Sequence, residues 1–313
     1  MESVVYMDGN DVIEWEVDQT HMIKRYTSES LSFIDTHKHE NFYLYLAHNM
    51  PHVPIYASED FLGTSERGLY GDVIQEIDWS VGQILKKLED ENLLDNTIIV
   101  FSSDNGPWLV MQDQGGSAGE LREGKQYTFD GGVKVPTVAM WRGAIEGGQV
   151  NTDVISQMDW MPTFAALAGT AIPDSITLDG IDISQLLLED EDRANDEILL
   201  YGINGKLRGF RKGDYKLKLP FEGFDGARWR QGVAAHDTLL YNVVNDPGES
   251  NNLLDIEPQR VREMYGSMYD AVNDLGPIHQ GHFTHRTPED HGFYKYLAEK
   301  NAANPEYWKT AAN

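Results

Sequence analysis

Hydrophobic positions follow two different periods along residues 20–170. In residues 71–91 apolar side chains recur every three or four positions, which predicts an amphipathic helix. Weaker patterns predict two further helices at residues 20–38 and 161–168. Short apolar runs predict strands at residues 42–47, 97–101 and 135–141, the first two buried on both faces. This alternation predicts an α/β fold, a mostly parallel sheet with helices on both faces.

The pattern changes at both ends of the chain. Residues 1–20 alternate apolar and acidic positions around Asp8-Gly9-Asn10, which predicts a hairpin. Beyond residue 190, strand-like runs at 205–219 and 236–243 and a helical pattern at 257–273 predict a small antiparallel sheet with one helix. We therefore expect an α/β domain over 1–190, a small α+β subdomain over 191–275 and a surface tail over 276–313.

Composition and charge narrow the possible functions. The 313 residues include no cysteine, which excludes disulfides, thiolate metal sites and an encoded cysteine nucleophile. Lys and Arg number 25 against 51 Asp and Glu, a net charge of −26, which argues against nucleic-acid binding. No apolar run is long enough to span a membrane, and residues 1–19 lack the features of a secretory signal. An anionic substrate would need a local cluster of cations.

Three polar segments lie just after predicted strands or between them, where ligands bind in open α/β sheets. His52 lies between two prolines, although a lone loop histidine is more often a solvated residue. Asp104 and Asn105 offer the hard oxygen donors that calcium or magnesium prefers, although Asn-Gly is also common in turns. Lys125, in a glycine-rich segment, could reach a bound oxyanion, or the segment could be an ordinary surface loop.

Four strings occur in a characteristic order: FYLYLAHNMPHVP, GLYGDVIQEIDWSVGQIL, TIIVFSSDNGP and LREGKQYTFDGGVKVPTVAMW. Together with LRGFRKGDYKLKL and LYNVVNDPGESNNL they resemble the formylglycine-dependent sulfatases, close to bacterial arylsulfatases. The resemblance covers about residues 20–275. It implies an alkaline-phosphatase-like fold and a hydrolase acting on sulfuric esters of a small molecule or a glycan.

The resemblance also implies roles for individual residues. Asp104 and Asn105 match the family's downstream calcium ligands, which makes calcium the expected cofactor. Lys125 matches the lysine that contacts the sulfate group, and His52 matches the histidine beside the scissile ester oxygen. The full-length enzyme is expected in the periplasm or outside the cell.

The upstream parts of the family pattern are missing. No Cys/Ser-x-Pro-x-Arg motif, from which formylglycine is made, occurs in the chain, and no Asp-Asp pair supplies further calcium ligands. The upstream Lys-x-His sulfate motif is absent as well. Because every missing part belongs to the N-terminal portion, we expect this chain to be the C-terminal piece of a sulfatase. Without the missing N-terminal portion, and the formylglycine expected there, the chain alone is predicted to be inactive.

Two other functions remain open from the sequence. A phosphatase or phosphodiesterase of the same superfamily would use two zinc ions and typically has Asp-His where this chain has Asp104-Asn105. Asparagine is a poor zinc ligand and an acceptable calcium ligand, which favours the sulfatase. A sulfatase-like protein that binds its ligand without catalysis is the non-enzymatic alternative.

Overall fold

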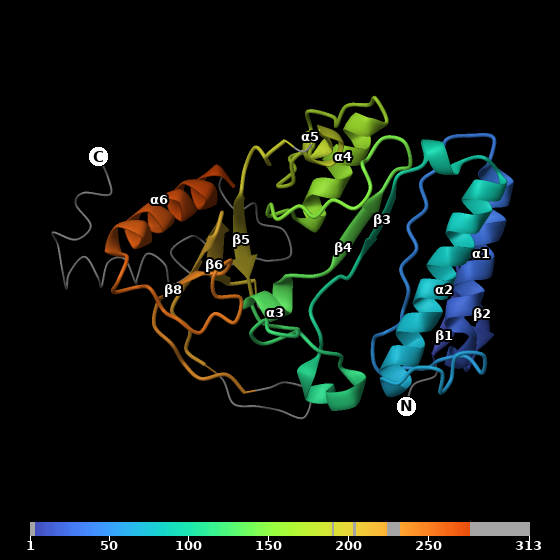
Figure 1. Cartoon of the computed structure of the whole chain (residues 1–313), viewed down its shortest axis with the longest axis horizontal. Helices are drawn as coiled ribbons and strands as arrows, with labels where there is room; N and C mark the ends of the chain where they lie inside the picture. Colours follow the sequence, from blue (N-terminus) through green and yellow to red (C-terminus); the bar gives the residue numbers. More distant parts are fainter. Residues whose placement is uncertain (1–3, 190, 203–204, 224–231, 276–313) are drawn as a thin grey trace. The chain divides into compact units, whose positions relative to one another are not determined.

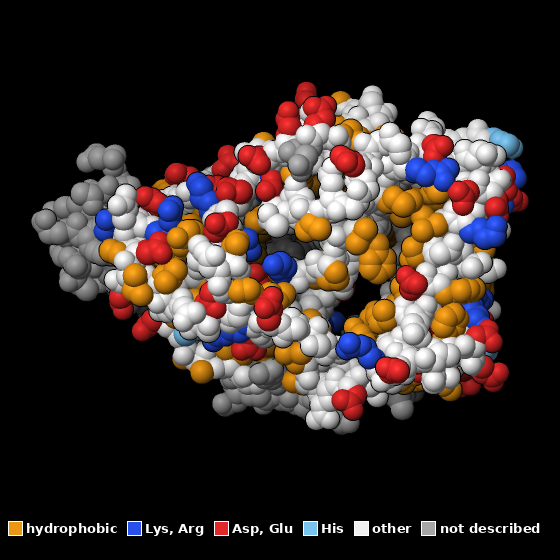
Figure 2. All heavy atoms as spheres, in the orientation of Figure 1, with side chains coloured by type: hydrophobic (Ala, Val, Ile, Leu, Met, Phe, Trp, Pro, Cys, Tyr) orange, Lys and Arg blue, Asp and Glu red, His pale blue; other side chains and the backbone are white. Residues whose placement is uncertain are grey.

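A computed structural model describes residues 4–189, 191–202, 205–223 and 232–275. The chain forms two compact units. The first contains residues 1–99, 111–116 and 140–144, and the second contains 100–110, 117–139 and everything from 145 onward. Acidic side chains are spread over the visible face, as the net charge of −26 requires (Figure 2). No helix among the described residues is long and apolar enough to cross a membrane.

The first unit begins with the predicted hairpin. Strands β1 (Val5–Asp8) and β2 (Asp11–Trp15) pair antiparallel, and Gly9 in their turn has a φ of 57°. A short 3-10 helix, η1 (Gln19–His21), leads into helix α1. The side chain of Asp18 caps η1 by accepting a hydrogen bond from the backbone N–H of Thr20.

Two long helices, α1 (Met22–His37) and α2 (Gly68–Asp90), lie side by side in this unit (Figure 1). Their apolar stripes meet in two clusters of buried side chains, one around Ile23 and Val73 and the other around Ile34 and Leu88. Both helices agree with the predicted ones to within about three residues, because a three-to-four-residue period is a local signal. Helix η2 (Leu94–Asn96) follows α2.

The strand predicted at residues 42–47 is wrong. The segment is extended but belongs to none of the three sheets formed by the described residues. Phe42 and Leu44 pack on the cluster around Ile34, whereas Tyr43 and Tyr45 are 69% and 78% exposed. Strand structure requires a neighbouring backbone to share hydrogen bonds, and apolar character alone does not supply one.

The second unit contains most of strands β3 (Ile99–Ser102) and β4 (Thr137–Met140), which form a two-stranded sheet. Both strands lie where strands were predicted, but β3 is not buried on both faces as expected, since Phe101 is 44% exposed. The segment between them holds two short helices, η3 (Leu109–Gln114) and α3 (Asp130–Val133). After β4 come η4 (Gln157–Asp159), α4 (Trp160–Leu167) and α5 (Ser184–Glu189), of which only α4 was predicted. The second unit's buried Asp159 accepts hydrogen bonds from Arg193 at 3.0 Å.

The predicted small antiparallel sheet is present and has four strands in sequence order. They are β5 (Glu197–Tyr201), β6 (Leu207–Lys212), β7 (Tyr215–Lys218) and β8 (Leu239–Asn242). Residues 205–219 thus form a hairpin, β6–β7, and β5 was not predicted. Helix α6 (Pro258–Asp274) packs on the sheet through an apolar core that includes Phe210, Leu217, Leu240 and Met268 (Figure 1). The α/β class with a small C-terminal antiparallel sheet is therefore confirmed. The predicted tail at 276–313 lies outside the described residues.

Candidate active site

Asp104 and Asn105 occupy a turn directly after β3. Ser103 shapes this turn by donating a hydrogen bond from its hydroxyl to the carbonyl of Asn105 at 3.0 Å. The turn is joined to β4, because the N–H of Ser103 donates to the carbonyl of Pro136 at 3.4 Å. The side chain of Asp104 is exposed, so its carboxylate is accessible to a ligand.

The segment carrying Lys125 lies against this turn. The backbone N–H of Lys125 donates to the carbonyl of Pro107 at 2.8 Å, and the N–H of Gly106 donates to the carbonyl of Gly132 at 3.1 Å. A Cβ atom on Gly106 would lie 1.8 Å from the carbonyl oxygen of Gly131. Only glycine permits so close a backbone approach. The structure therefore brings together the second and third polar segments identified in the sequence.

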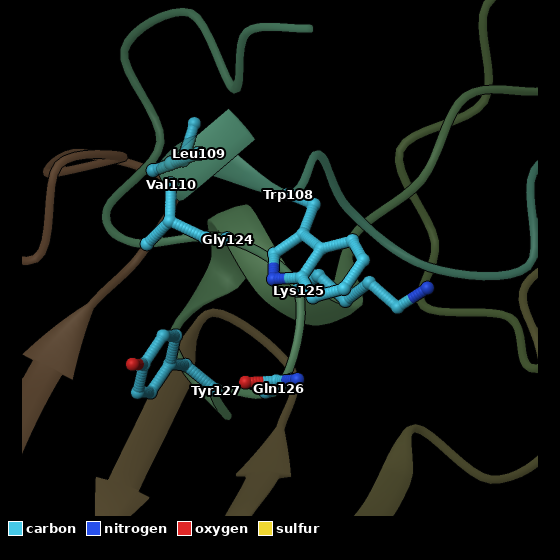
Figure 3. A pocket seen from close by; sticks show the side chains of 7 residues that line it. All are labelled: Trp108, Leu109, Val110, Gly124, Lys125, Gln126 and Tyr127. Carbon is cyan, nitrogen blue, oxygen red and sulfur yellow. The ribbon is translucent and has the colours of Figure 1, made fainter. Parts of the chain in front are cut away.

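The side chain of Lys125 runs alongside the indole ring of Trp108 (Figure 3). Its Nζ atom lies 5.3 Å from the centre of that ring, within the range of a cation–π interaction. The two residues border a hollow of about 10 Å³, which Gly124 and Tyr127 also line. The hollow therefore has room for about one water-sized group beside the lysine.

Residues on both sides of Lys125 adopt a backbone conformation that is uncommon for their type. Glu123 has a φ of 62° and Gln126 a φ of 83°, in the left-handed region that costs a non-glycine residue free energy. Burial raises the pKa of the Glu123 carboxyl group, with Arg122 opposing that rise. A backbone held in this conformation must be stabilised by the structure around it.

His52 lies in the first unit, in the turn that follows residues 42–47. Its backbone N–H donates to the carbonyl of Asn49 at 3.1 Å, so His52 closes a turn here, whereas a residue held between two prolines would be expected to be extended. The imidazole is exposed, and its Nδ1 atom lies 2.9 Å from the carbonyl oxygen of Val53. Because a carbonyl only accepts, Nδ1 carries a proton in this hydrogen bond.

Three comparisons with known proteins bear on this arrangement. The family model described as Sulfatase matches residues 3–170, more than half of the chain. Human N-acetylgalactosamine-6-sulfatase is 36% identical over 257 residues, covering 76% of this chain, and bovine arylsulfatase A is 35% identical over 263 residues, covering 77%. The chain belongs to the sulfatase family.

The structural comparison agrees with this assignment. A solved Bacteroides thetaiotaomicron protein, described in connection with the metabolism of multiple glycosaminoglycans, is 28% identical with a TM-score of 0.74. It covers 82% of this chain, and the chain covers 55% of it. The sulfatase chain thus has the alkaline-phosphatase-like fold, and it spans about half the length of the curated relatives it matches, 49% of the human enzyme and 52% of the bovine one.

The donor chemistry of this sulfatase chain fits part of a calcium site. Asp104 supplies a carboxylate and Asn105 an amide oxygen, both hard ligands of the kind calcium takes. Calcium takes six to eight oxygens, and among the described residues no group of three His, Asp or Glu side chains is placed to hold a metal ion. These two residues would therefore contribute two donors to a site completed by others.

The sequence analysis missed the contacts that hold the Lys125 segment against the C-terminal sheet. The side chain of Arg122 donates to the carbonyl of Glu249 at 2.8 Å and to the hydroxyl of Tyr241 at 3.2 Å. Lys216 and Lys218 on β7 also reach this segment. Their alternation along the strand was visible in the sequence, but nothing there indicated that a loop covers their face of the sheet.

Proposed function

We propose that this chain supplies the calcium-binding and sulfate-binding half of an active site that hydrolyses sulfate esters. The observation that carries the proposal is the backbone hydrogen bond of 2.8 Å from Lys125 to Pro107. It joins Lys125, in a glycine-rich segment, to the turn that bears two calcium-type donors, Asp104 and Asn105. Membership of the sulfatase family supports the same reaction.

Lys125 has the charge that the reaction requires. A sulfate ester is anionic, and hydrolysis transfers negative charge to the departing oxygen. The Lys125 ammonium group would hold the sulfate and offset this charge, while the chain as a whole, at −26, repels anions. Calcium, bound by Asp104 and Asn105 among others, would add positive charge at the same group.

His52 is proposed as the general acid. Its Nδ1–H is engaged with the carbonyl of Val53, which fixes the orientation of the ring. Once the ring is protonated, Nε2–H is the proton it can donate to the leaving-group oxygen. This role requires His52 to lie near Lys125 in the complete enzyme.

The nucleophile is proposed to come from outside these 313 residues. The chain contains neither cysteine nor a Ser-x-Pro-x-Arg motif, and it spans about half the length of its curated relatives. A formylglycine hydrate in the N-terminal portion would supply the attacking oxygen. Without a nucleophile, positioning and electrostatics leave the most difficult step unassisted, so the chain alone should not hydrolyse an aryl sulfate above background.

The substrate is proposed to be a sulfated small molecule or a sulfated glycan. The match to an N-acetylgalactosamine-6-sulfatase supports a sulfated sugar, and the match to an arylsulfatase supports an aryl sulfate. The shared chemistry is a sulfate monoester, which Lys125 would bind in either case.

The test is aryl sulfate hydrolysis by this chain produced together with the N-terminal portion and its formylglycine. Lys125→Ala should lower kcat/KM by about 10²–10³, the loss expected for removing one donor to a developing oxyanion. Lys134→Ala, a change at an exposed lysine nearby, is the matched control and should leave turnover unchanged. Equal losses in the two variants would overturn the role of Lys125.

A further inference from the structure

The C-terminal sheet has two faces of opposite character. Register pairs Phe210 with Leu217 and Leu217 with Leu240, and this fully buried row packs against α6. One residue along, Arg211 pairs with Lys216 and Lys216 with Tyr241, and these side chains point to the other face. A strand that reads Tyr-Lys-Leu-Lys would usually expose its lysines to solvent, yet Lys216 is 0% and Lys218 3% exposed.

The residues that cover the lysines belong to residues 122–133, which we call the Lys125 loop. Lys216 forms ion pairs with Asp130 of this loop and with Glu249, to which its Nζ lies 2.9 Å away. The N–H of Asp130 in turn donates to the carboxylate of Glu249 at 2.6 Å. Asp130 and Glu249 are 2% and 0% exposed, so the cluster is sealed from water.

A second set of contacts lies beside the first. Lys218 donates to the hydroxyl of Thr128, and its Nζ lies 4.1 Å from the centre of the Phe129 ring. The guanidinium of Arg122 lies over the same ring at 4.0 Å. Because Arg122 also donates to Tyr241 on β8, contacts to the sheet hold the loop on both sides of the half-buried Lys125.

We propose that Lys216 and Lys218 are positioning residues that hold the Lys125 loop, and with it the Lys125 ammonium group, in the geometry that binds the sulfate. The role of Lys125 rests on the proposed function, whereas the anchoring of the loop does not. The loop requires such an anchor because Glu123 and Gln126, on either side of Gly124 and Lys125, adopt unfavourable backbone conformations.

A purely stabilising role explains these buried charges less well. The sheet already has an apolar core against α6, and replacing a buried ion pair with apolar residues is often neutral or stabilising. Burial and the nearby Lys216 lower the pKa of Lys218 well below its ordinary value, so its charge is unfavourable where it lies. These charged side chains fix the geometry of the loop through directed contacts, which apolar residues could not provide.

The test uses the 313-residue chain with lysine labelled at 13Cε, and it needs no ligand. The Lys125 signal is assigned by its loss in Lys125→Arg, and the Trp108 ring current shifts it away from the other lysines. In the Lys216→Met and Lys218→Met variants, the Lys125 signal should move to the chemical shift of the other lysines. Amide hydrogen exchange within residues 122–133 should rise about 10- to 100-fold, the loss expected for a hydrogen bond to a charged group.

Lys212→Met is the matched control. Lys212 lies on β6 of the same sheet and forms an ion pair with Glu197 at 2.8 Å. Its side chain is 43% exposed, and its hydrogen bonds in the structure described go to Glu197 and Ser267, outside the loop. It should leave the Lys125 signal and the exchange of the loop unchanged.

Two results would overturn the proposal. One is an unshifted Lys125 signal in the Lys218→Met variant, which retains the Lys216 cluster and should fold. The other is exchange in the same Lys218→Met variant that rises equally in the loop, β6, β7 and α6, since that would mean a general loss of stability. Either result would leave the proposed sulfatase activity untouched. If instead the loop behaves as predicted here but the chain, produced with the N-terminal portion, does not hydrolyse an aryl sulfate, the proposed function is refuted and the anchoring is not.

Discussion

The Lys125 loop and the segment that carries His52 differ in how this chain supports them. The Lys125 loop is joined by backbone hydrogen bonds to the turn at Pro107 and by buried ion pairs to the C-terminal sheet. The His52 segment follows residues 42–47, which have the composition of a strand but form none in the described structure. Met50 and Ile55, on either side of His52, are buried in the apolar cluster around Ile23 and Val73. The two parts of the proposed active site therefore differ in the kind of support: buried ion pairs hold the Lys125 loop, and apolar packing next to an unpaired strand-like segment holds His52.

This difference indicates which part of the enzyme positions Lys125 and which part positions His52. A loop anchored by its own chain can hold its geometry without further partners. A strand-like segment needs a neighbouring backbone, and Tyr43 and Tyr45 are exposed where such a neighbour would bury them. We therefore expect the Lys125 side of the site to be fixed in this chain and the His52 side to depend on the N-terminal portion.

The largest expected effect concerns His52. In the complete enzyme, His52→Ala should lower kcat/KM by about 10²–10⁴, the range for a positioned general acid. The loss should be smaller for an aryl sulfate with a good phenolic leaving group, which needs no proton. His39→Ala, at an exposed position of the same unit, is the control. Equal losses for good and poor leaving groups would mean that His52 binds sulfate and is not the acid.

The next effect compares the stability of the two regions. Lys216→Met should lower the free energy of unfolding of the second unit by about 3–5 kcal/mol, because it removes the cation that Asp130 and Glu249 share and leaves only Arg211, 3.5 Å from Asp130, as an ion-pair partner of these buried carboxylates. Tyr45→Thr, at an exposed position outside any sheet, should change stability by less than about 0.5 kcal/mol. Urea unfolding measures the free energy of unfolding of both variants, and similar losses in the two would contradict the difference between the regions.

Calcium binding tests whether the Asp104–Asn105 turn is complete in itself. Two ligands leave most of the six to eight oxygen positions of calcium to water, so calorimetry should detect weak binding at most. Tight, stoichiometric binding that is lost in Asp104→Ala would contradict this, because it would require further ligands within the chain.

The smallest effect is a pH dependence in the first unit. Burial lowers the pKa of His48 below its ordinary value of 6.5, so the unfolded chain binds a proton more readily than the folded one. Stability should therefore rise with pH between the lowered pKa and 6.5, and fall on acidification through that window. Hydrogen exchange in α1 and α2 at pH 5 and pH 7 measures the change. His48→Gln should weaken it, and an unaltered dependence would contradict the assignment.

The sequence predicted the elements whose signals are local. The period of α2 and the turn at Gly9 are properties of short segments, and both lie where the sequence placed them. The strand expected at 42–47 failed because pairing depends on residues elsewhere. The glycines around Lys125 indicated close backbone contact. The structure shows such a contact, because a Cβ atom on Gly106 would lie only 1.8 Å from the carbonyl oxygen of Gly131.

The anchoring of the Lys125 loop could not be predicted. Lys216 and Asp130 are 86 positions apart, and only the fold brings them together. Alternation in β7 correctly separates Leu217 from the lysines, but it does not indicate which face is covered. The relation of His52 to Lys125 stays a prediction for the same reason.

A crystal structure of the complete enzyme with bound sulfate would test the central claim most directly. We predict that the side chains of His52, Asp104 and Lys125 border one cleft, with the sulfate against the Lys125 ammonium group and calcium against Asp104 and Asn105. A structure that places His52 and Lys125 on opposite faces of the sheet would contradict the account.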